Sequence, residues 1–281
     1  MKIHIWYHRD GDGFASAYAA WKKFGDKAIY KGVQYEEAMP EVSSGDELYI
    51  LDFSYSRDML LKLALDGVNL KVFDHHQTAQ VNLAKLDFAT FDMEKSGCRM
   101  SWEYFHPDKL LPVILAYIED RDLWRFKLEN SEAINIAFMC YKWDFKIWDE
   151  AIIDAEKYRQ GDSMTENVLL IKGKAMLEFR DTLIKMALSK TKMTRIGGYE
   201  NVPMINSSML PSEVAHALLK KHPNAPFVVV WHHAGFRTIV NLRSMGEFDV
   251  SVIAKKFGGG GHKNAAGFVA PTSMLTFESF K

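Results

Sequence analysis

The sequence has few cysteines, no long apolar run and almost no net charge. Its two cysteines, Cys98 and Cys140, exclude a disulfide framework and favour a cytoplasmic setting. No apolar run approaches the roughly 18 residues that a membrane-spanning helix needs, and no apolar signal-peptide core follows the N-terminus. Because the formal net charge is −1 over 281 residues, a polyanion would have to bind at a local patch or through metal ions. The 48% hydrophobic content is that of an ordinary soluble globular protein.

The pattern along the chain predicts two α/β domains joined by a helical linker. Over residues 1–145, β-rich runs alternate with helical segments, which indicates a mostly parallel, doubly wound sheet with helices on both faces. Residues 146–193 show helical periodicity with many charges, and residues 194–281 form a smaller α/β domain. The expected strands are 3–7, 28–35, 48–53, 70–73, 88–91, 226–231, 237–243 and 266–270. The expected helices are 13–24, 57–65, 97–105, 110–119, 211–221 and 249–257.

Acidic residues and histidines follow three predicted strands of the first domain. His8, Asp10 and Asp12 follow the first strand, Asp52 the third, and Asp74-His75-His76 the fourth. Because the C-terminal ends of parallel strands share one edge, we expect these side chains to converge there. Carboxylates that converge repel each other unless a cation neutralises them. The pattern therefore predicts a metal site, and the number of candidate ligands indicates two metals.

Each cluster also has a simpler interpretation when it is taken alone. Asp-Gly pairs are common in turns, and Asp52 could cap the helix that follows it. The adjacent histidines His75 and His76 have no packing reason after an apolar strand, and a neighbouring acid such as Asp74 typically orients a ligating imidazole. By contrast, His232-His233 lies in a predicted hairpin turn without acidic neighbours, so we interpret that pair as surface residues.

A fourth acidic cluster, Glu119-Asp120-Arg121-Asp122, closes a predicted apolar helix. Acids at a helix C-terminus oppose the helix dipole, so a functional role and a merely exposed helix end both stay open for this cluster.

The second domain contains four consecutive glycines, Gly258 to Gly261, followed by His262. A flexible linker is one interpretation of this run. Glycines between a helix and a histidine also suit a backbone that must approach a ligand closely. Arg243, at the end of a predicted strand, could clamp a phosphate with two N–H groups. Together these residues predict a phosphate-binding site.

Taken together, the first-domain clusters resemble the four motifs of the DHH phosphoesterase superfamily, in order and at suitable spacing. The matching residues are His8-Arg9-Asp10-Gly11-Asp12-Gly13, Asp52, Asp74-His75-His76 and Asp120. In the second domain, Gly259 to Gly267 resembles the glycine-rich signature of the DHH-associated C-terminal domain, and Asn241-Leu242-Arg243-Ser244 resembles its substrate-binding strand. The resemblance spans nearly the whole chain.

The resemblance implies a phosphodiesterase of the nanoRNase type that uses two Mn²⁺ ions, with Mg²⁺ or Co²⁺ as alternatives, to hydrolyse short RNA or small nucleotides with activated water. The implied metal ligands are His8, Asp10, Asp12, Asp52, His75 and Asp120, with Asp52 bridging. His76 would contact the scissile phosphate or protonate the leaving oxygen, and Asp74 would orient a neighbouring imidazole. The implied substrate-binding residues are Arg243, Gly259, Gly260, Gly261, His262 and Asn264.

The segment Tyr117 to Trp124 departs from the usual nanoRNase motif, in which a Thr-Gly pair follows the aspartate, and this departure keeps Asp122 as a rival of Asp120. It is closer to the branch with the second bacterial nanoRNase and proposed cyclic-mononucleotide phosphodiesterases. The alternatives are therefore a cyclic nucleotide phosphodiesterase, a 3′-phosphoadenosine 5′-phosphate phosphatase, and a catalytically silent nucleotide sensor. A homodimer is one expected assembly, and no membrane partner is expected.

Overall fold

The computed structural model describes residues 1–34, 37–159 and 168–271. The end of predicted strand 28–35, part of the predicted linker and the last ten residues of the second domain lie outside these ranges. The contacts divide the chain into a first unit, Met1–Leu177, and a second unit, Glu178–Lys281. This division falls inside helix α8 (Val168–Leu188), and the domain boundaries expected after residues 145 and 193 stay predictions.

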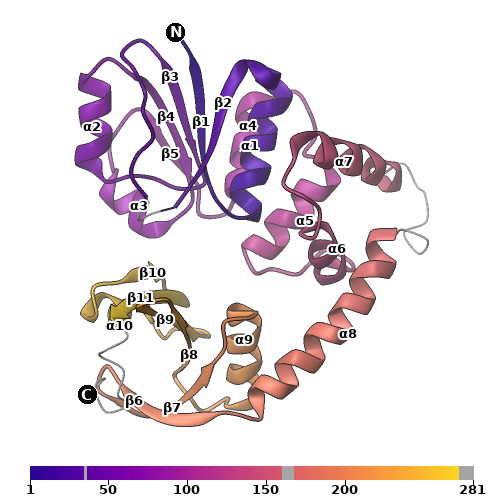
Figure 1. Ribbon diagram of the computed structural model, residues 1–281, viewed down its shortest axis with the longest axis vertical. Coiled ribbons are helices and arrows are strands. Elements are labelled where there is room, and N and C mark those ends of the chain that lie inside the picture. The colour runs from indigo at the N-terminus through magenta and orange to yellow at the C-terminus, as the bar shows by residue number, and fades with distance from the viewer. Residues whose placement is uncertain (35–36, 160–167, 272–281) are drawn as a thin grey trace. The chain divides into compact units, whose positions relative to one another are not determined.

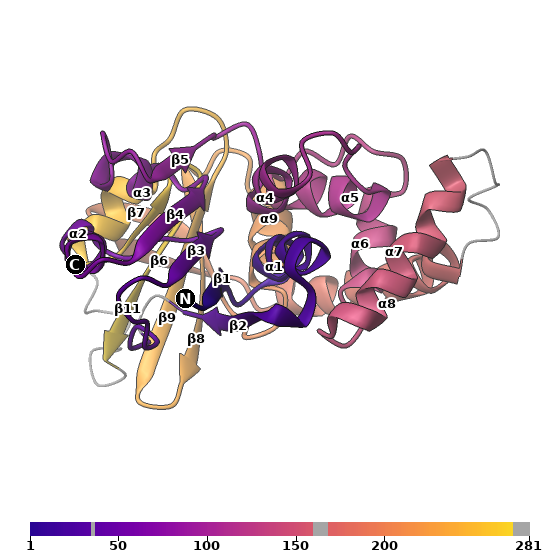
Figure 2. The ribbon, with the colours of Figure 1, turned by 90° about the horizontal axis from the view of Figure 1, so that it is seen from above.

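The first unit contains a five-stranded, wholly parallel sheet with the strand order β2-β1-β3-β4-β5 (Figures 1 and 2). Its strands are β1 (Ile3–His8), β2 (Ala28–Val33), β3 (Glu47–Leu51), β4 (Asn69–Asp74) and β5 (Ala89–Phe91). Strand order reverses between β1 and β3, so the loops after these two strands open into one crevice at the C-terminal edge. The predicted doubly wound fold is confirmed, and its switch point coincides with two of the acidic clusters.

Helices cover both faces of this sheet, as Figure 1 shows. Helices α1 (Gly11–Phe24) and α4 (Gly97–Phe105) pack on the face to which Ile5 contributes. Helix α2 (Arg57–Leu65) packs on the other face, which includes the next residue, Trp6. Because side chains alternate along a strand, these neighbouring apolar residues serve the two faces in turn. The short helix α3 (Gln77–Asn82), which the sequence pattern did not predict, begins directly after the two histidines.

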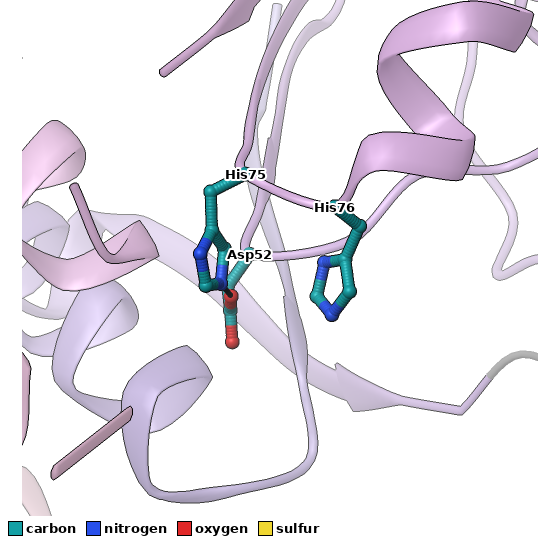
Figure 3. A group of neighbouring side chains, drawn as sticks. All are labelled: Asp52, His75 and His76. Carbon is teal, nitrogen blue, oxygen red and sulfur yellow. Dashed lines mark ion pairs between the residues drawn. The ribbon is translucent and has the colours of Figure 1, made fainter. Parts of the chain in front are cut away.

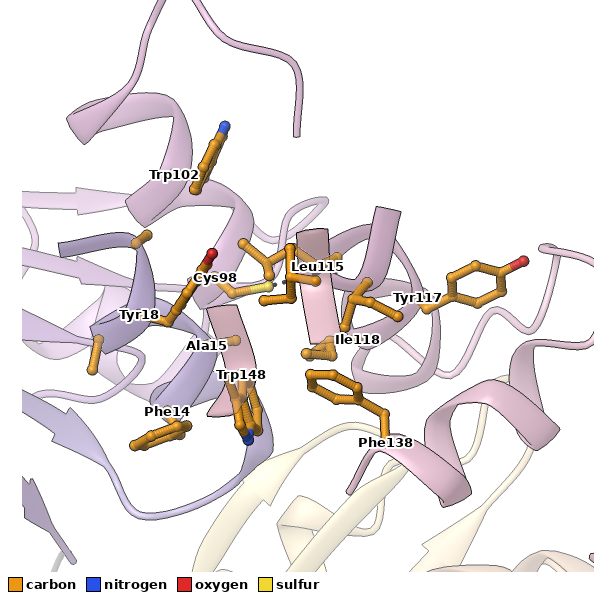
Figure 4. Packing of buried hydrophobic residues seen from close by; sticks show 14 of the residues in the cluster. Phe14, Ala15, Tyr18, Cys98, Trp102, Leu115, Tyr117, Ile118, Phe138 and Trp148 are labelled. Carbon is orange, nitrogen blue, oxygen red and sulfur yellow. Dashed lines mark hydrogen bonds between the residues drawn. The ribbon is translucent and has the colours of Figure 1, made fainter. Parts of the chain in front are cut away.

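Three further helices extend the first core, and Figure 4 shows the aromatic residues at their junction. They are α5 (Val113–Asp122), α6 (Ser131–Phe138) and α7 (Phe145–Arg159). The ring of Trp148 lies 4.7 Å from that of Phe14 and 4.6 Å from that of Phe138, and all three side chains are buried. Helix α5 packs in the same core, so its last turn, which carries the fourth acidic cluster, has a fixed position.

The second unit contains a six-stranded mixed sheet with the order β10-β11-β9-β8-β7-β6. Only β7 and β8 pair in parallel among the paired strands described. The strands are β6 (Lys192–Ile196), β7 (Tyr199–Asn206), β8 (Phe227–Ala234), β9 (Arg237–Ser244), β10 (Gly260–His262) and β11 (Ala265–Pro271). Helix α9 (Pro211–Lys221) covers one face and α10 (Ser251–Lys256) packs on the other.

The hairpin of β8 and β9 is longer than expected. The turn predicted over residues 232–236 is wrong, because β8 continues through both histidines to Ala234. His233 bonds Thr238 across the hairpin (Nδ1···Oγ1 2.9 Å), and His232 is half-buried, so the surface interpretation fits only part of the pair. In the described ranges, no helix combines the length and apolar character of a membrane span.

Candidate metal centre

The turn between β1 and α1 is shaped by its own carboxylates. Asp10 caps α1, and its Oδ1 accepts a hydrogen bond from the Gly13 amide at 2.9 Å. A Cβ atom at Gly13 would collide with the carbonyl oxygen of His8, so only glycine permits this close return of the chain. Asp12 is buried in the first turn of α1, where the helix dipole favours negative charge. The three predicted ligands of this turn therefore project from a tightly defined backbone.

Helix α4 holds the Asp12 carboxylate from the other side of the site. The amides of Gly97 and Cys98 donate to its Oδ2 and Oδ1 at 2.6 and 3.1 Å. A Cβ atom at Gly97 would lie 2.5 Å from the Cβ of Asp52, so glycine is also required there. The predicted helix 97–105 starts where expected, with Ser96 as its cap. The contact of Gly97 with Asp12, 85 residues earlier, was not predicted.

Asp52 follows β3 in a left-handed conformation (φ 62°) and is fully buried. Aspartate and asparagine tolerate this region better than other side-chain-bearing residues. In this position Asp52 Oδ1 lies 3.2 Å from His75 Nε2, and Asp52 Oδ2 lies 3.8 Å from His8 Nδ1. Asp52 thus stands between the two histidines, as expected of a bridging ligand.

The Asp74 side chain organises the two histidines that follow it. Its Oδ1 accepts hydrogen bonds from the amides of His75 and His76 at 2.7 and 3.1 Å, and it contacts His76 Nδ1 at 2.7 Å. Figure 3 shows the His75 ring directed at Asp52 and the His76 ring beside them. Asp74 therefore lies where it can orient the His76 imidazole, which is the kind of role predicted for it.

The last turn of α5 presents Asp122, and not Asp120, to this group. Asp122 Oδ2 lies 3.5 Å from His75 Nε2. The two carboxylate oxygens of Asp120 instead accept hydrogen bonds from the amides of Lys127 and Leu128, at 2.9 and 3.1 Å. This placement differs from the prediction of Asp120, because residues two apart on a helix project about 200° from each other.

The side chains form three overlapping groups whose ligand atoms lie within 4.8 Å of one another in each group. Asp52 belongs to two of the groups, and so does His75, which links all three into one site. The groups are His8-Asp10-Asp52, Asp12-His75-Asp122 and Asp52-His75-His76. Oxygen and imidazole nitrogen donors of this kind suit Mn²⁺ and similar divalent cations.

The electrostatics of the site favour a cation. Burial and the neighbouring charges of Asp12 and Asp10 raise the pKa of Asp52 well above its usual value. The Asp122 side chain is 27% exposed, yet partial desolvation and the charges of Asp12 and Asp10 raise its pKa as well. Burial lowers the pKa of His75, which favours the neutral, metal-binding imidazole. Among the described residues, the buried Asp52 Oδ1 finds no hydrogen-bond donor in suitable geometry. The residues therefore fit a divalent cation, which would neutralise the carboxylates and occupy this oxygen.

In the second unit, Arg243 of β9 lies against α9. Its guanidinium donates to the carbonyl oxygen of Leu242 at 3.0 Å and to the hydroxyl of Ser212 at 3.1 Å. Burial lowers its pKa, and the nearby Glu213 carboxylate acts in the opposite direction. A half-buried guanidinium whose two hydrogen-bond acceptors are both neutral fits an anionic ligand.

The glycine-rich segment is constrained chiefly by its own backbone. A Cβ atom at Gly259 would collide with the Gly267 carbonyl oxygen, and one at Gly261 (φ 136°) would lie 2.6 Å from that of Ala265. Gly260 differs, because nothing lies within 4 Å of the position where its Cβ would be. Close strand packing thus accounts for Gly259 and Gly261, and of the three predicted substrate-binding glycines Gly260 is the one with open space beside it.

The two polar residues after the glycines lie at the β10–β11 hairpin. His262 of β10 pairs with Ala265 of β11. The Asn264 amide nitrogen donates to the Ser244 hydroxyl at 2.9 Å and to the Gly246 carbonyl at 3.1 Å. Asn264 therefore stabilises the turn after β9, and its substrate-binding role stays a prediction.

Comparison with known proteins gives one coherent picture. The DHH family N-terminal domain matches residues 2–122, and the DHHA1 domain matches residues 203–277. The chain is 30% identical over 303 residues to an uncharacterized protein of Acanthamoeba polyphaga mimivirus, covering 99% of this chain and 70% of that protein. It is 22% identical over 296 residues to oligoribonuclease NrnB of Bacillus subtilis, covering 94% and 72%. The Mn²⁺ complex of RecJ from Thermus thermophilus has the same fold (TM-score 0.52, 16% identity, 99% of this chain and 50% of that chain).

Proposed function

The chain belongs to the DHH phosphoesterase superfamily, and on that premise we propose that it is a Mn²⁺-dependent phosphodiesterase that hydrolyses short oligoribonucleotides or small nucleotides. The observation that carries the proposal is the continuous ligand group in which Asp52 and His75 each join two clusters. Similarity to the oligoribonuclease NrnB supports short RNA as the substrate class.

We assign two cation positions to the group. His8, Asp10 and Asp52 would hold the first cation, and a second would be held by the cluster Asp12, Asp52, His75 and Asp122. When bound, such a pair activates water and neutralises charge at phosphorus. The α4 amides leave a lone pair on each Asp12 oxygen, so this carboxylate can be oriented by the helix and still accept a cation.

His76 is the residue that we assign to proton transfer or phosphate contact. Asp74 fixes the His76 ring through Nδ1, so Nε2 is the nitrogen that would meet the substrate. A proton on that nitrogen would pass to the leaving oxygen as the P–O bond breaks. Asp74 is thus a positioning residue, because it acts through His76.

We assign phosphate binding in the second unit to Arg243, His262 and the open backbone at Gly260. The Arg243 guanidinium would give two parallel N–H bonds to a phosphate, and its half-buried position strengthens them. These contacts position the substrate and supply binding free energy without taking part in bond breaking.

A substrate panel with Mn²⁺ tests the proposal. It contains diribonucleotides, 5-mers, a long single strand, cyclic mono- and dinucleotides, and 3′-phosphoadenosine 5′-phosphate, each with and without EDTA. We expect release of mononucleotides from dinucleotides and 5-mers at rates well above those for the long strand, and loss of all activity in EDTA. Preference for a cyclic nucleotide or for 3′-phosphoadenosine 5′-phosphate would replace the substrate class. No hydrolysis of any compound with Mn²⁺, Mg²⁺ or Co²⁺ would overturn the proposal.

A further inference from the structure

The loop that follows α5 alternates aromatic and basic residues. It comes directly after the helix turn that carries Asp122 of the candidate metal centre. It reads Trp124-Arg125-Phe126-Lys127 and begins two residues after Asp122. The Trp124 side chain is 39% exposed, and Arg125 and Lys127 are also exposed. No more than about 7 Å separates the Cα atoms of Asp122 and Trp124, because two residues span no more than that. An accessible indole therefore stands at the margin of the metal centre.

This loop adopts an unfavourable backbone conformation. Trp124 (φ 54°) and Phe126 (φ 47°) both lie in the left-handed region, which bulky residues rarely adopt and which costs about 1 kcal/mol or more for each. A plain surface loop has no need of two such residues within three positions. The conformation points the loop in a direction that ordinary turn geometry would not give.

Asp120 stabilises this loop conformation through its carbonyl oxygen and its carboxylate. Its carbonyl oxygen accepts the amides of Arg125 and Phe126 at 2.8 and 3.3 Å, and its carboxylate accepts those of Lys127 and Leu128. The buried position of Asp120 strengthens these bonds. One residue therefore binds four consecutive amides of the loop, while Asp122 on the same helix turn faces the metal group.

The loop is also bonded to the segment that leads into α4, the helix whose first amides orient Asp12. Arg125 donates to the Glu94 carbonyl oxygen at 2.8 Å and to its carboxylate at 3.1 Å, just before α4 begins at Gly97. The rings of Trp124 and Phe126 meet edge to face at 5.0 Å, which supports the indole. Helix α5, through Asp120, and the segment before α4, through Glu94, thus anchor the backbone that carries Trp124.

We propose that Trp124 stacks on a nucleobase of the substrate, at the nucleotide next to the scissile phosphate, with Lys127 attracting the adjoining phosphate charge. This inference deepens the proposed function and rests on it. An aromatic face among basic side chains binds single-stranded nucleotides without base specificity, because every base has a π face. The held backbone means that the ring is positioned before the substrate arrives, which lowers the entropy cost of binding.

The test measures kcat and KM with Mn²⁺ for a diribonucleotide and for its analogue that lacks the base at one nucleotide. Wild type is compared with Trp124→Leu, which keeps an apolar side chain, and with Trp124→Phe, which keeps an aromatic face. For the diribonucleotide we expect KM to rise about 10-fold in Trp124→Leu and less than about 3-fold in Trp124→Phe, with kcat nearly constant in both. For the base-free analogue, the wild-type KM should already be raised, and Trp124→Leu should add much less than it does on the diribonucleotide.

Tyr104→Leu is the matched control. Tyr104 is 43% exposed on the same unit and lies about 10 Å along α4 from its N-terminal end. This variant should keep KM within about 2-fold of wild type on both substrates. Thermal unfolding of all three variants checks that the fold is retained.

Two results would overturn the inference. One is an unchanged KM for the diribonucleotide in Trp124→Leu, and the other is an equal rise in KM on both substrates, which indicates a purely structural loop. If wild type hydrolyses neither substrate, short RNA as the proposed substrate class fails instead. Calorimetric binding of AMP and of ribose 5-phosphate then still tests the inference, because Trp124→Leu should weaken only the ligand with a base. Equal weakening of both ligands would reject it.

Discussion

The edges of the two sheets that carry the candidate site residues are shaped by different forces. At the edge of the first sheet, carboxylates determine the backbone: Asp10 binds the Gly13 amide, Asp12 binds the start of α4, and Asp74 binds the two amides that follow it. At the glycine-rich edge of the second sheet, close backbone packing determines the conformation around Gly259. The candidate residues of the first edge therefore serve both structure and chemistry.

This difference predicts how each edge responds to substitution. A carboxylate oxygen has more than one lone pair, so an aspartate can bind an amide and a cation together. Replacing such a residue by its amide keeps much of the local structure and removes the charge that the cation needs. At the second edge, a substitution at a packed glycine damages the fold before it affects ligand binding. Substitutions at the two edges should therefore separate a loss of catalysis from a loss of stability.

The largest effect on activity is expected for Asp52→Asn. Asparagine fits the left-handed backbone at this position, so the fold should be retained. We expect kcat to fall about 1,000-fold or more, because the residue shared by both assigned cation positions loses its charge. In EDTA, Tm should rise by roughly 2–4 °C, because burial and nearby carboxylates raise the pKa of Asp52 and its charge destabilises the metal-free fold. Substantial Mn²⁺-dependent activity in this variant would refute the assignment.

The next effect distinguishes the two aspartates at the end of α5. Asp122→Asn should weaken Mn²⁺ binding and lower kcat about 100-fold, and it should not lower Tm in EDTA, because partial desolvation and nearby carboxylates also raise the pKa of Asp122. Asp120→Asn should lower the free energy of unfolding by about 1–3 kcal/mol, because it weakens bonds to two loop amides. Calorimetric Mn²⁺ titration and thermal unfolding of both variants measure the contrast. The opposite pattern, with Mn²⁺ binding lost only in Asp120→Asn, would show that Asp120 is the metal ligand, as the sequence predicted.

A smaller effect is expected at the second edge for Arg243→Ala. We expect KM to rise about 10- to 100-fold with kcat within about 3-fold of wild type, because a charged hydrogen-bonding group that positions phosphate is lost. The KM of Arg243→Lys should lie between those of wild type and Arg243→Ala, since lysine keeps the charge without the bidentate geometry. Steady-state kinetics on a diribonucleotide decide this, and an unchanged KM would argue against a phosphate clamp.

The smallest effect is expected for Gly260→Ala. Open space surrounds this position, so Tm should stay within about 2 °C of wild type while KM rises a few-fold. Gly259→Ala is the matched comparison, because the same methyl group would collide with the Gly267 carbonyl oxygen and destabilise the second unit by several kcal/mol. Equal Tm values for the two variants would contradict the backbone explanation of this edge.

The sequence predicted the parts of the fold and site that depend on local pattern. Alternation of β-rich and helical segments was enough for the doubly wound sheet, and the convergence of Asp52 with His75 followed from parallel strands sharing an edge. Short helix α3 and strands β6 and β7 were missed, because they are brief or only partly apolar and are defined by their packing.

Contacts between distant segments could not be predicted. The choice between Asp120 and Asp122 depends on the exact helical phase and on amides of a later loop, which no spacing rule fixes. The contact of Gly97 with Asp12 joins segments 85 residues apart. The collision that requires glycine at residue 259 exists only once β10 and β11 have paired.

Crystals grown with MnCl₂ and measured at a wavelength with manganese anomalous scattering test the central claim most directly. We predict two anomalous peaks about 3.5–4 Å apart. Asp52 should lie between them, with His8 and Asp10 on one side and Asp12, His75 and Asp122 on the other. An isolated peak away from Asp52, or a manganese ion ligated by Asp120 instead of Asp122, would contradict the account.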